Sequence, residues 1–370
     1  MDDFRFVVPC LFGLEGIAAD ELRRLGVQEV NAENGRVLFS GTTLDLARAN
    51  INLATGERVV ILVGEGRADT FDMLFELVRA MPWERYIPKN GKFPVTGYAL
   101  NSKLHSVPDC QKIIKKAIAV RLTEKYGNAL HPEDGSEFRV RFAIMNDAAA
   151  LMIDTSGAGL HKRGYRPVSV AAPLRETLAA AMVRVARFRG REAMRDPFCG
   201  SGTIAIEAAL AAKNRAPGLS RNFTAESWSA VPQDVWTTAR DEAKAREYSG
   251  AYDICGGDID ESCVEMSQAN AKRAGVADIV RFERADARSF APGSERGVVI
   301  TNPPYGERVM ERSEAERLYK EFGAATKTLP DWKLFLLSSH TEFERSFGKK
   351  ATKKRKLYNG MIKCDLFMYY

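Results

Sequence analysis

The sequence predicts an α/β protein: a C-terminal doubly wound, mostly parallel sheet that ends in a hairpin, preceded by two smaller α+β units. Three observations carry this prediction. The 370 residues are enough for two or three domains. From residue 193 onward, apolar strands alternate with helices in the manner of βαβ units. Before residue 157, two cycles of short strands and amphipathic helices fit separate α+β units.

The first α+β unit is expected over residues 1–60 and the second over residues 61–156. Apolar positions at helical spacing, such as Ile17, Leu22 and Leu25, indicate the helices. We expect strands at 4–8, 37–39, 58–63, 93–100, 138–144 and 150–153. We expect helices at 15–25, 44–53, 70–79 and 110–126. The last two strands would form a closing pair, and antiparallel sheets fit this order best.

A basic linker over residues 157–167 leads into the large α/β unit, which is expected over residues 168–370. Its predicted helices are 173–187, 204–212 and 261–274. Its predicted strands are 193–196, 253–258, 279–285, 297–302 and 332–339. A hairpin would pair 355–358 with 361–370 around an Asn359-Gly360 turn. Residues 213–252 form an insertion whose role the sequence does not reveal.

The composition excludes several classes of protein. No apolar run approaches the roughly 18 residues that span a bilayer, and the first residues do not look like a signal peptide, so we expect a cytoplasmic protein. Six cysteines without C-x-x-C spacing and four histidines make a metal site improbable. The net charge of +6 is compatible with a polyanionic partner but does not identify one.

The sharpest motif is Asp-Pro-Phe-Cys-Gly-Ser-Gly-Thr at 196–203, between a short strand and a helix. Gly200 and Gly202 would let the backbone approach a ligand closely, and the N–H groups of the helix N-terminus would face an anion or carboxylate. The full G-x-G-x-x-G pattern is absent and no lysine follows the second glycine. Dinucleotides and nucleoside triphosphates are therefore disfavoured.

Acidic residues follow the next two strands. Asp258 is placed to accept bonds from both hydroxyls of a ribose, since one carboxylate can accept two bonds at once. Asp260 is expected to cap the helix after it. Asp286 could accept a bond from an adenine amino group, and a helix cap is an equally good interpretation.

The last motif is Asn302-Pro303-Pro304-Tyr305, directly after an apolar strand. The prolines have fixed φ and no N–H donor, so a proline carbonyl and the Asn302 side-chain oxygen can together accept bonds from one exocyclic amine. Tyr305 offers a ring on which a base can stack. Two such acceptors would pull a planar, weakly nucleophilic amine toward tetrahedral geometry without a strong base.

In combination, these motifs resemble the amino-methyltransferases, a Rossmann-like, class I group that uses S-adenosylmethionine. The resemblance covers about residues 165–370, and it includes Pro173 to Thr177, which match the helix that closes over the cofactor. It implies a catalytic site at Asn302, Pro303, Pro304 and Tyr305. It implies cofactor binding by Thr177, Asp196, Pro197, Phe198, Gly200, Gly202, Thr203, Asp258, Ile259, Asp286, Ala287 and Asn302.

The N-terminal half points to the substrate. Residues 154–166 closely resemble the junction that follows a THUMP domain in bacterial ribosomal-RNA methyltransferases, and the two α+β units fit a ferredoxin-like plus THUMP pair. The resemblance implies methylation of guanine N2 in structured RNA, in particular 23S ribosomal RNA. Phosphate contacts are possible at basic residues that could equally form a solvated surface. These residues are Lys162, Arg163, Arg166, Lys353, Lys354 and Arg355.

Four alternatives stay open. The same catalytic half could methylate adenine N6 in DNA, although no target-recognition region is evident, or guanine N2 in transfer RNA. An RNA-binding protein with a decayed catalytic half would keep the fold but not the cofactor. A nicotinamide dehydrogenase is disfavoured by the incomplete glycine pattern. The oligomeric state is open.

Overall fold

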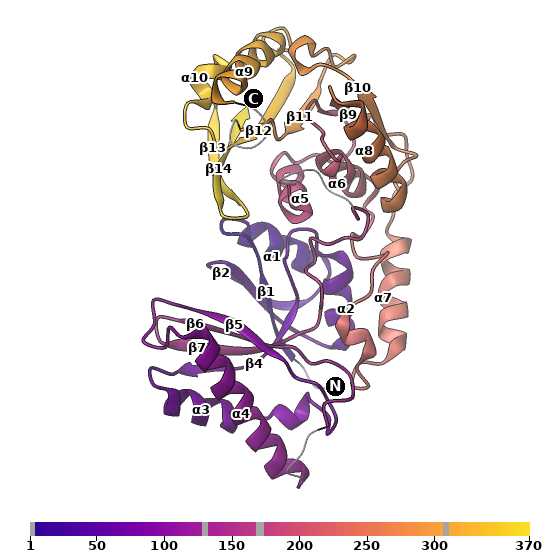
Figure 1. The fold of residues 1–370 in the computed structure, drawn as a ribbon. Coiled ribbons are helices and arrows are strands. Elements are labelled where there is room, and N and C mark those ends of the chain that lie inside the picture. The colour runs from indigo at the N-terminus through magenta and orange to yellow at the C-terminus, as the bar shows by residue number, and fades with distance from the viewer. Residues whose placement is uncertain (1–3, 128–131, 168–173, 306–310) are drawn as a thin grey trace.

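Two seven-stranded sheets, one in each half of the chain, organise the structure (Figure 1). The computed structural model describes residues 4–127, 132–167, 174–305 and 311–370. The strands of the N-terminal sheet lie in the order β2 (Gln28–Glu33), β3 (Arg36–Gly41), β1 (Phe4–Pro9), β4 (Val60–Arg67), β7 (Ala148–Asp154), β6 (Val140–Met145) and β5 (Val95–Leu100). The helices of this half are α1 (Glu15–Arg24), α2 (Thr43–Asn52), α3 (Phe71–Ala80), the 3₁₀ turn η1 (Trp83–Arg85) and α4 (Val107–Tyr126).

The N-terminal half differs from the expectation in two respects. Its two α+β units share one sheet, because β4 pairs with β1 on one side and with β7 on the other. The sheet is also not wholly antiparallel: β5 pairs with β6 in parallel, since α4 carries the chain back across the sheet between them. The expected closing pair is present as antiparallel β6 and β7. Strand β2 was not predicted, because its sequence is mostly polar and it lies at the sheet edge.

The C-terminal half confirms the doubly wound α/β prediction. Its strands lie in the order β10 (Val280–Arg284), β9 (Ile254–Asp258), β8 (Ala193–Asp196), β11 (Gly297–Thr301), β12 (Trp332–Ser338), β14 (Ile362–Tyr369) and β13 (Lys353–Asn359). The first five are parallel, and β13 and β14 are antiparallel. The helices are α5 (Glu176–Val185), α6 (Thr203–Lys213), α8 (Glu261–Ala274), η3 (Ala287–Ser289), α9 (Arg312–Thr326) and α10 (Phe343–Phe347).

Two details of this half bear on the site. Asp260 caps α8 as predicted, because its Oδ1 accepts a bond of 2.9 Å from the Ser262 N–H. The hairpin turn is shifted by one residue from the prediction. Asn359 pairs with Ile362, so the two-residue loop is Gly360-Met361, and Gly360 supplies the positive φ of +64° that its first position requires.

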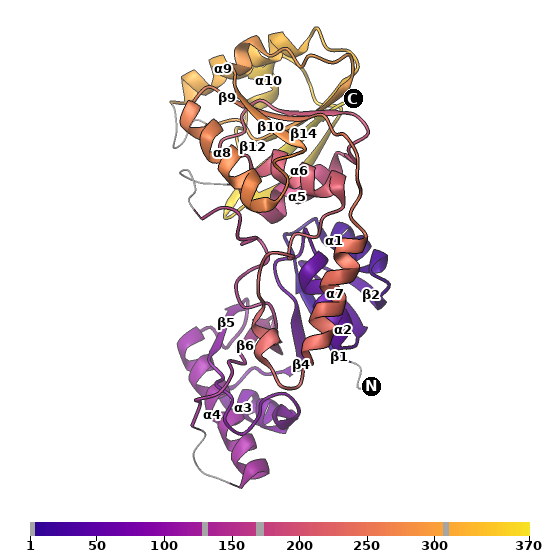
Figure 2. The same cartoon turned by 90° about the vertical axis from the view of Figure 1, so that its right-hand side faces the viewer.

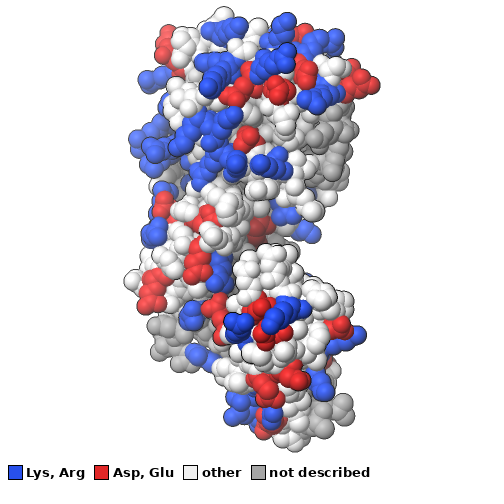
Figure 3. All heavy atoms as spheres, turned by 90° about the vertical axis from the view of Figure 1, so that its left-hand side faces the viewer, with Lys and Arg blue, Asp and Glu red and all other residues white. Residues whose placement is uncertain are grey.

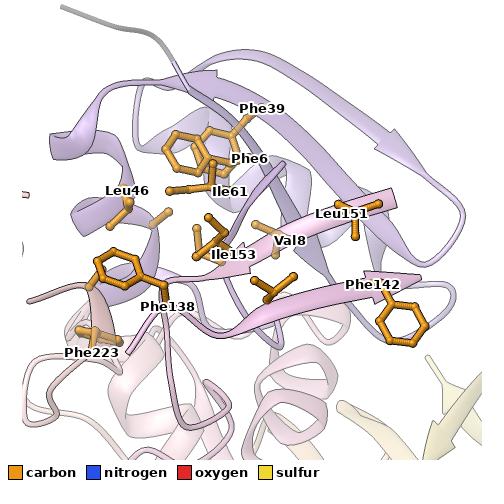
Figure 4. Close-up of a cluster of buried hydrophobic side chains, with 14 of the residues drawn as sticks. Phe6, Val8, Phe39, Leu46, Ile61, Phe138, Phe142, Leu151, Ile153 and Phe223 are labelled. Atoms are coloured by element: carbon orange, nitrogen blue, oxygen red, sulfur yellow. The ribbon is translucent and has the colours of Figure 1, made fainter. Parts of the chain in front are cut away.

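The insertion belongs structurally to the N-terminal half. It contains η2 (Thr224–Ser227) and α7 (Gln233–Ala245), and α7 lies beside α2 in both ribbon views (Figures 1 and 2). Arg48 on α2 forms a two-pronged ion pair with Glu242 on α7, at 2.6 and 2.7 Å. Phe223 enters the large N-terminal core near Phe138 (Figure 4). The segment therefore returns from the second half to cover the first.

Candidate active site

A pocket of about 670 Å³ opens at the carboxyl ends of β8, β9, β10 and β11. The strand order reverses between β8 and β11, and ligands of doubly wound sheets bind in the crevice at such a reversal. The pocket gathers nearly all the residues that the sequence predicted for cofactor binding and catalysis. They are Asp196, Pro197, Phe198, Gly200, Thr203, Asp258, Ile259, Asp286, Ala287, Asn302, Pro303, Pro304 and Tyr305. Pro173, the first residue of the predicted cofactor helix, lies outside the described residues.

Asp196 is a buried carboxyl at the floor of this pocket, and its residue is only 1% exposed. Its Oδ1 accepts a bond of 2.5 Å from the Thr301 hydroxyl and one of 3.4 Å from the Phe198 N–H. Its Oδ2 is buried and has no hydrogen-bond partner in the structure. Burial raises the pKa of Asp196 to about 7, and the nearby charge of Asp258 acts in the same direction. The orphan oxygen is suited to a cationic donor from a ligand.

The glycine loop is held by side chains of strand β9 and helix α8. Asp258 Oδ2 accepts a bond of 2.9 Å from the Gly200 N–H. On α8, the Ser267 hydroxyl donates to the Gly200 carbonyl and the Asn270 amide donates to the Ser201 carbonyl. Neither of these two buried polar residues was predicted from the sequence. Their signal was their spacing of three on one face of the predicted helix.

The two glycines serve different purposes. Gly200 has φ +53° and open space where a Cβ would stand, so it leaves room beside the pocket. Gly202, with φ +79°, does not line the pocket, and a Cβ there would lie 2.9 Å from the Cβ of Ser267. Its expected cofactor contact stays a prediction. Gly202 is needed for the turn into α6 and for close packing against α8.

Asp286 functions as a cap in this structure. Its Oδ1 accepts the Arg288 N–H at 2.9 Å, and its two oxygens also bind the Arg288 guanidinium at distances from 2.5 to 2.9 Å. The bond from Arg288 lowers the pKa of Asp286. A ligand amino group would have to compete with Arg288 for this carboxylate.

At the Asn-Pro-Pro-Tyr turn, the Tyr305 hydroxyl donates to Asn302 Oδ1. Burial raises the pKa of the Tyr305 phenol well above its usual range, so the hydroxyl keeps its proton and stays a donor. The ring packs partly against the core instead of standing free. The Tyr319 hydroxyl donates to the Pro304 carbonyl and so fixes the turn from α9. In this conformation Tyr305 occupies the oxygen that the sequence assigned to an incoming amine.

This contact leads to a prediction for Tyr305. Tyr305→Phe removes the competing donor and keeps the ring, so we expect the rate of the catalysed reaction to stay within about threefold of the wild type. Tyr305→Ala removes the ring, and the loss of about 1–3 kcal/mol of base stacking should lower kcat/KM by roughly 10-fold to 100-fold. Single-turnover rates of the two variants measure the difference. Equal losses would mean that the hydroxyl, and not the ring, is the functional group.

Thr177 does not reach the pocket. It was expected to bind the cofactor, but its side chain is fully buried and its hydroxyl donates to Glu57 Oε1 at 2.6 Å. Glu57 lies just before β4, and its Oε2 also contacts His161 at 3.3 Å and Arg175 at 3.5 Å. Burial opposes the charge of Glu57, but the bonds from His161 and Thr177 outweigh it and lower the pKa of Glu57. The N-terminal half thus anchors the start of α5, next to the pocket residue Leu174.

We expect Glu57→Ala to raise the Kd of the pocket's cofactor several-fold while changing the rate of bound-state chemistry little. The reason is that Leu174 and the first turn of α5 lose their anchor, whereas the strand-end residues stay in place. Calorimetric titration of the cofactor checks this, with Glu57→Gln as the matched variant that keeps one acceptor for Thr177. An unchanged Kd in Glu57→Ala would mean that the anchor does not shape the pocket.

The structure corrects several of the residues predicted to contact phosphates. Arg163 is buried, bonds to the carbonyls of Leu160 and Ala54, and pairs with Glu207 at 3.4 Å. Arg166, with a side chain 8% exposed, pairs with Glu176 and donates to Thr203 Oγ1 at 2.8 Å. Arg163 therefore ties the linker to both halves, and Arg166 ties it to the C-terminal half. Lys162 is exposed.

The basic residues of the C-terminal hairpin differ in their exposure and in their partners. Lys353 is exposed. Lys354 is also exposed but pairs with Glu344 at 2.8 Å, and Arg355 donates to the Gly13 carbonyl across the two halves. Arg355 is thus a structural contact.

Within the described part of the chain, no group of three or more His, Cys, Asp or Glu residues is placed to hold a metal ion. No helix among those residues is both long enough and apolar enough to cross a bilayer.

Fold and site define a class I, S-adenosylmethionine-dependent methyltransferase. The chain belongs to the RMKL-like methyltransferase family, whose methyltransferase domain matches residues 163–367. Residues 5–60 match the RlmL ferredoxin-like domain and residues 68–154 match the THUMP domain.

Two curated relatives and two crystal structures align along nearly the whole chain. "Putative RNA methyltransferase YpsC" of Bacillus subtilis is 43% identical over 100% of this chain and 97% of its own length. "Ribosomal RNA large subunit methyltransferase K/L" of Syntrophotalea carbinolica is 33% identical over 96% of this chain but only 52% of its own length, so the chain spans about half of such relatives. A structure from Listeria monocytogenes, described as a "predicted N6-adenine-specific DNA methylase", is 45% identical with a TM-score of 0.95, covering 100% and 97% of the two chains. SMU.472, "a putative methyltransferase complexed with SAH", is 40% identical with a TM-score of 0.94, covering 100% and 98%.

Proposed function

We propose that this protein transfers a methyl group from S-adenosylmethionine to the exocyclic N2 amine of a guanine in structured RNA, and that its substrate is 23S ribosomal RNA. The observation that carries the proposal is the position of Asn302. It follows β11 in the same pocket as Asp196 and Asp258, with two prolines behind it. An RNA substrate of this kind would be met in the cytoplasm.

The residues present fit the cofactor. The partnerless Oδ2 of Asp196 matches the ammonium group of a methionine moiety, which would relieve the cost of a buried carboxylate. Asp258 keeps acceptor capacity for ribose hydroxyls beyond its bonds to the Gly200 and Asp260 N–H groups. The apolar walls around them suit an adenosine ring. S-adenosylmethionine supplies the electrophilic methyl group when it is bound.

The protein's own groups then bind and orient the amine. Asn302 Oδ1 and a proline carbonyl at the turn would accept its two N–H bonds and hold its lone pair toward the methyl group. Tyr305 must first release Asn302 Oδ1, which frees its ring to lie against the base. The amine proton becomes acidic once the methyl group has been transferred, so positioning replaces a strong base.

The choice of RNA is supported by the THUMP match and by the names of the two curated relatives. The description of the Listeria structure favours adenine N6 of DNA as the second candidate, and guanine N2 of transfer RNA is the third. These candidates share the catalytic site and differ in the nucleic acid that the N-terminal half would receive.

One experiment separates them. The purified protein is incubated with tritiated S-adenosylmethionine and, in separate tubes, ribosomal RNA from a strain lacking the gene, transfer RNA and duplex DNA. The products are digested to nucleosides. Label in N2-methylguanosine from ribosomal RNA alone is the expected result. Label in N6-methyladenine from DNA would overturn the substrate and keep the site.

A further inference from the structure

The β13–β14 hairpin ends at the mouth of the catalytic pocket. Asn359 and Ile362 form the last pair of its ladder, and both line the pocket. Met361, between them in the loop, is 100% exposed. Met361 is therefore a fully exposed apolar side chain beside the mouth of the pocket, where an incoming substrate would meet it.

The same hairpin and the adjacent α10 carry an excess of positive charge. Seven exposed basic side chains lie between residues 345 and 363: Arg345, Lys349, Lys350, Lys353, Lys354, Lys356 and Lys363. Of these, Lys354 pairs with Glu344. Figure 3 shows lysine and arginine side chains gathered on this side of the methyltransferase half. Lysines on an edge strand also discourage aggregation, but that does not explain the basic residues that lie outside the strand.

The hairpin is held firmly at its base and is free at its tip. Inward-facing residues of β14 such as Leu366 and Met368 belong to the buried core. Arg355 fastens β13 to the Gly13 carbonyl of the N-terminal half. By register, Lys356 and Lys363 lie on the same face as each other and near the tip. The hairpin thus holds Met361 at its tip, with Lys356 and Lys363 nearby on one face of its two strands.

We propose that this hairpin is an RNA-engaging wedge: Lys356 and Lys363 hold the phosphate backbone, and Met361 inserts beside the target nucleotide as its base enters the pocket. The inference rests on the RNA substrate proposed above. A base must leave its stack to reach Asn302 at the strand end, which costs a few kcal/mol. Apolar side chains that enter between bases offset that cost in proteins that distort nucleic acids. Backbone cations position such a wedge without reading sequence.

Binding tests the charged part. The Kd of deproteinised ribosomal RNA is measured by filter retention at several salt concentrations between about 0.05 and 0.3 M. The slope of log Kd against log salt concentration is then determined. Lys356→Glu with Lys363→Glu should raise Kd at least about 10-fold and reduce the salt slope by roughly 2. The matched control is Lys244→Glu with Lys272→Glu, two exposed lysines on α7 and α8, on the other side of the molecule in Figure 1. The control should stay within about twofold.

Two measurements test the wedge. Met361→Ala should lower the single-turnover rate on folded RNA about 10-fold with cofactor Kd unchanged, and Met361→Leu should restore it, because a similar apolar volume returns. Ultraviolet cross-linking of the wild type should attach a nucleotide to the peptide that contains Met361, whether or not that RNA is methylated.

The outcomes separate this inference from the proposed function. The wedge alone would be overturned if the wild type binds RNA but the hairpin and control variants lose the same amount of RNA affinity. Cross-links that avoid the hairpin peptide would overturn it in the same way. A hairpin-dependent retention with label in another nucleoside would overturn only the guanine N2 assignment. A wild type that retains no RNA would overturn both.

Discussion

Asn302→Ala is expected to lower the methyl-transfer rate by about 10²–10³-fold while leaving the Kd of the cofactor within about threefold. The side-chain oxygen of Asn302 is the group that meets the amine as positive charge develops on it. Its loss should therefore raise the free energy of the transition state more than that of the bound ground state. The two neighbouring prolines keep the turn in place, and Tyr319 holds the Pro304 carbonyl from α9, so the backbone should survive the substitution.

Single-turnover transfer and calorimetric cofactor binding, measured on the same preparation, check this expectation. Asn302→Asp is the matched control, because it keeps an acceptor of the same size and adds a charge. We expect it to retain more activity than Asn302→Ala. A rise in cofactor Kd as large as the fall in rate would assign Asn302 to cofactor binding instead of catalysis.

Asp196→Asn is expected to weaken cofactor binding by about 2 kcal/mol or more, a loss of at least roughly 30-fold, because a buried charge partner of the ligand ammonium is removed. It should also abolish a pH dependence. In the free protein the carboxyl has a pKa of about 7 and is mostly protonated below it. A bound ammonium favours the ionised form, so binding releases a proton at low pH. Wild-type affinity should rise about tenfold per pH unit up to about pH 7 and then level off, and the variant should show no such rise.

The same substitution should stabilise the cofactor-free protein. The folded-state pKa of Asp196 lies about 3 units above its unfolded value, so the folded state holds a proton that the unfolded state gives up between about pH 4 and 7. The carboxyl therefore destabilises the fold increasingly as pH rises through that window, to about 4 kcal/mol above pH 7. Asp196→Asn should have a higher Tm than the wild type at pH 8 and a similar one at pH 4. A lower Tm at pH 8 would show that the carboxylate is already satisfied.

Residues at strand ends were predictable from sequence. Asp196 and Asp258 end short strands and Asn302 directly follows one. The carboxyl ends of parallel strands meet at one edge of the sheet, so the convergence of these residues follows from the βαβ pattern. Their hydrogen bonds were less predictable. The bond from the Tyr305 hydroxyl to Asn302 and the Arg288 partner of Asp286 depend on local side-chain geometry that no periodicity encodes.

Contacts between the halves could not be predicted. Thr177 matches a cofactor-helix motif, yet its hydroxyl is bound to Glu57, 120 positions earlier in the chain. Arg163 and Arg166 look like surface charges in a basic linker, but the fold buries them against Glu207 and Glu176. Glu57 and Glu207 are 120 and 44 positions away from their partners, and Glu176 is ten positions from Arg166. In each case the sequence offers no sign that the site is buried.

The return of the insertion to the first half joins the two parts into one cooperative body. Trp228 stacks on Phe138 at 4.7 Å and Phe223 stacks on Trp236 at 5.4 Å, so aromatic rings of the insertion complete a core begun about 90 residues earlier. Neither half is a module that recombination or a protease could release intact. An isolated catalytic half would expose these rings to water, and its failure to bind RNA would report misfolding as readily as a missing contact.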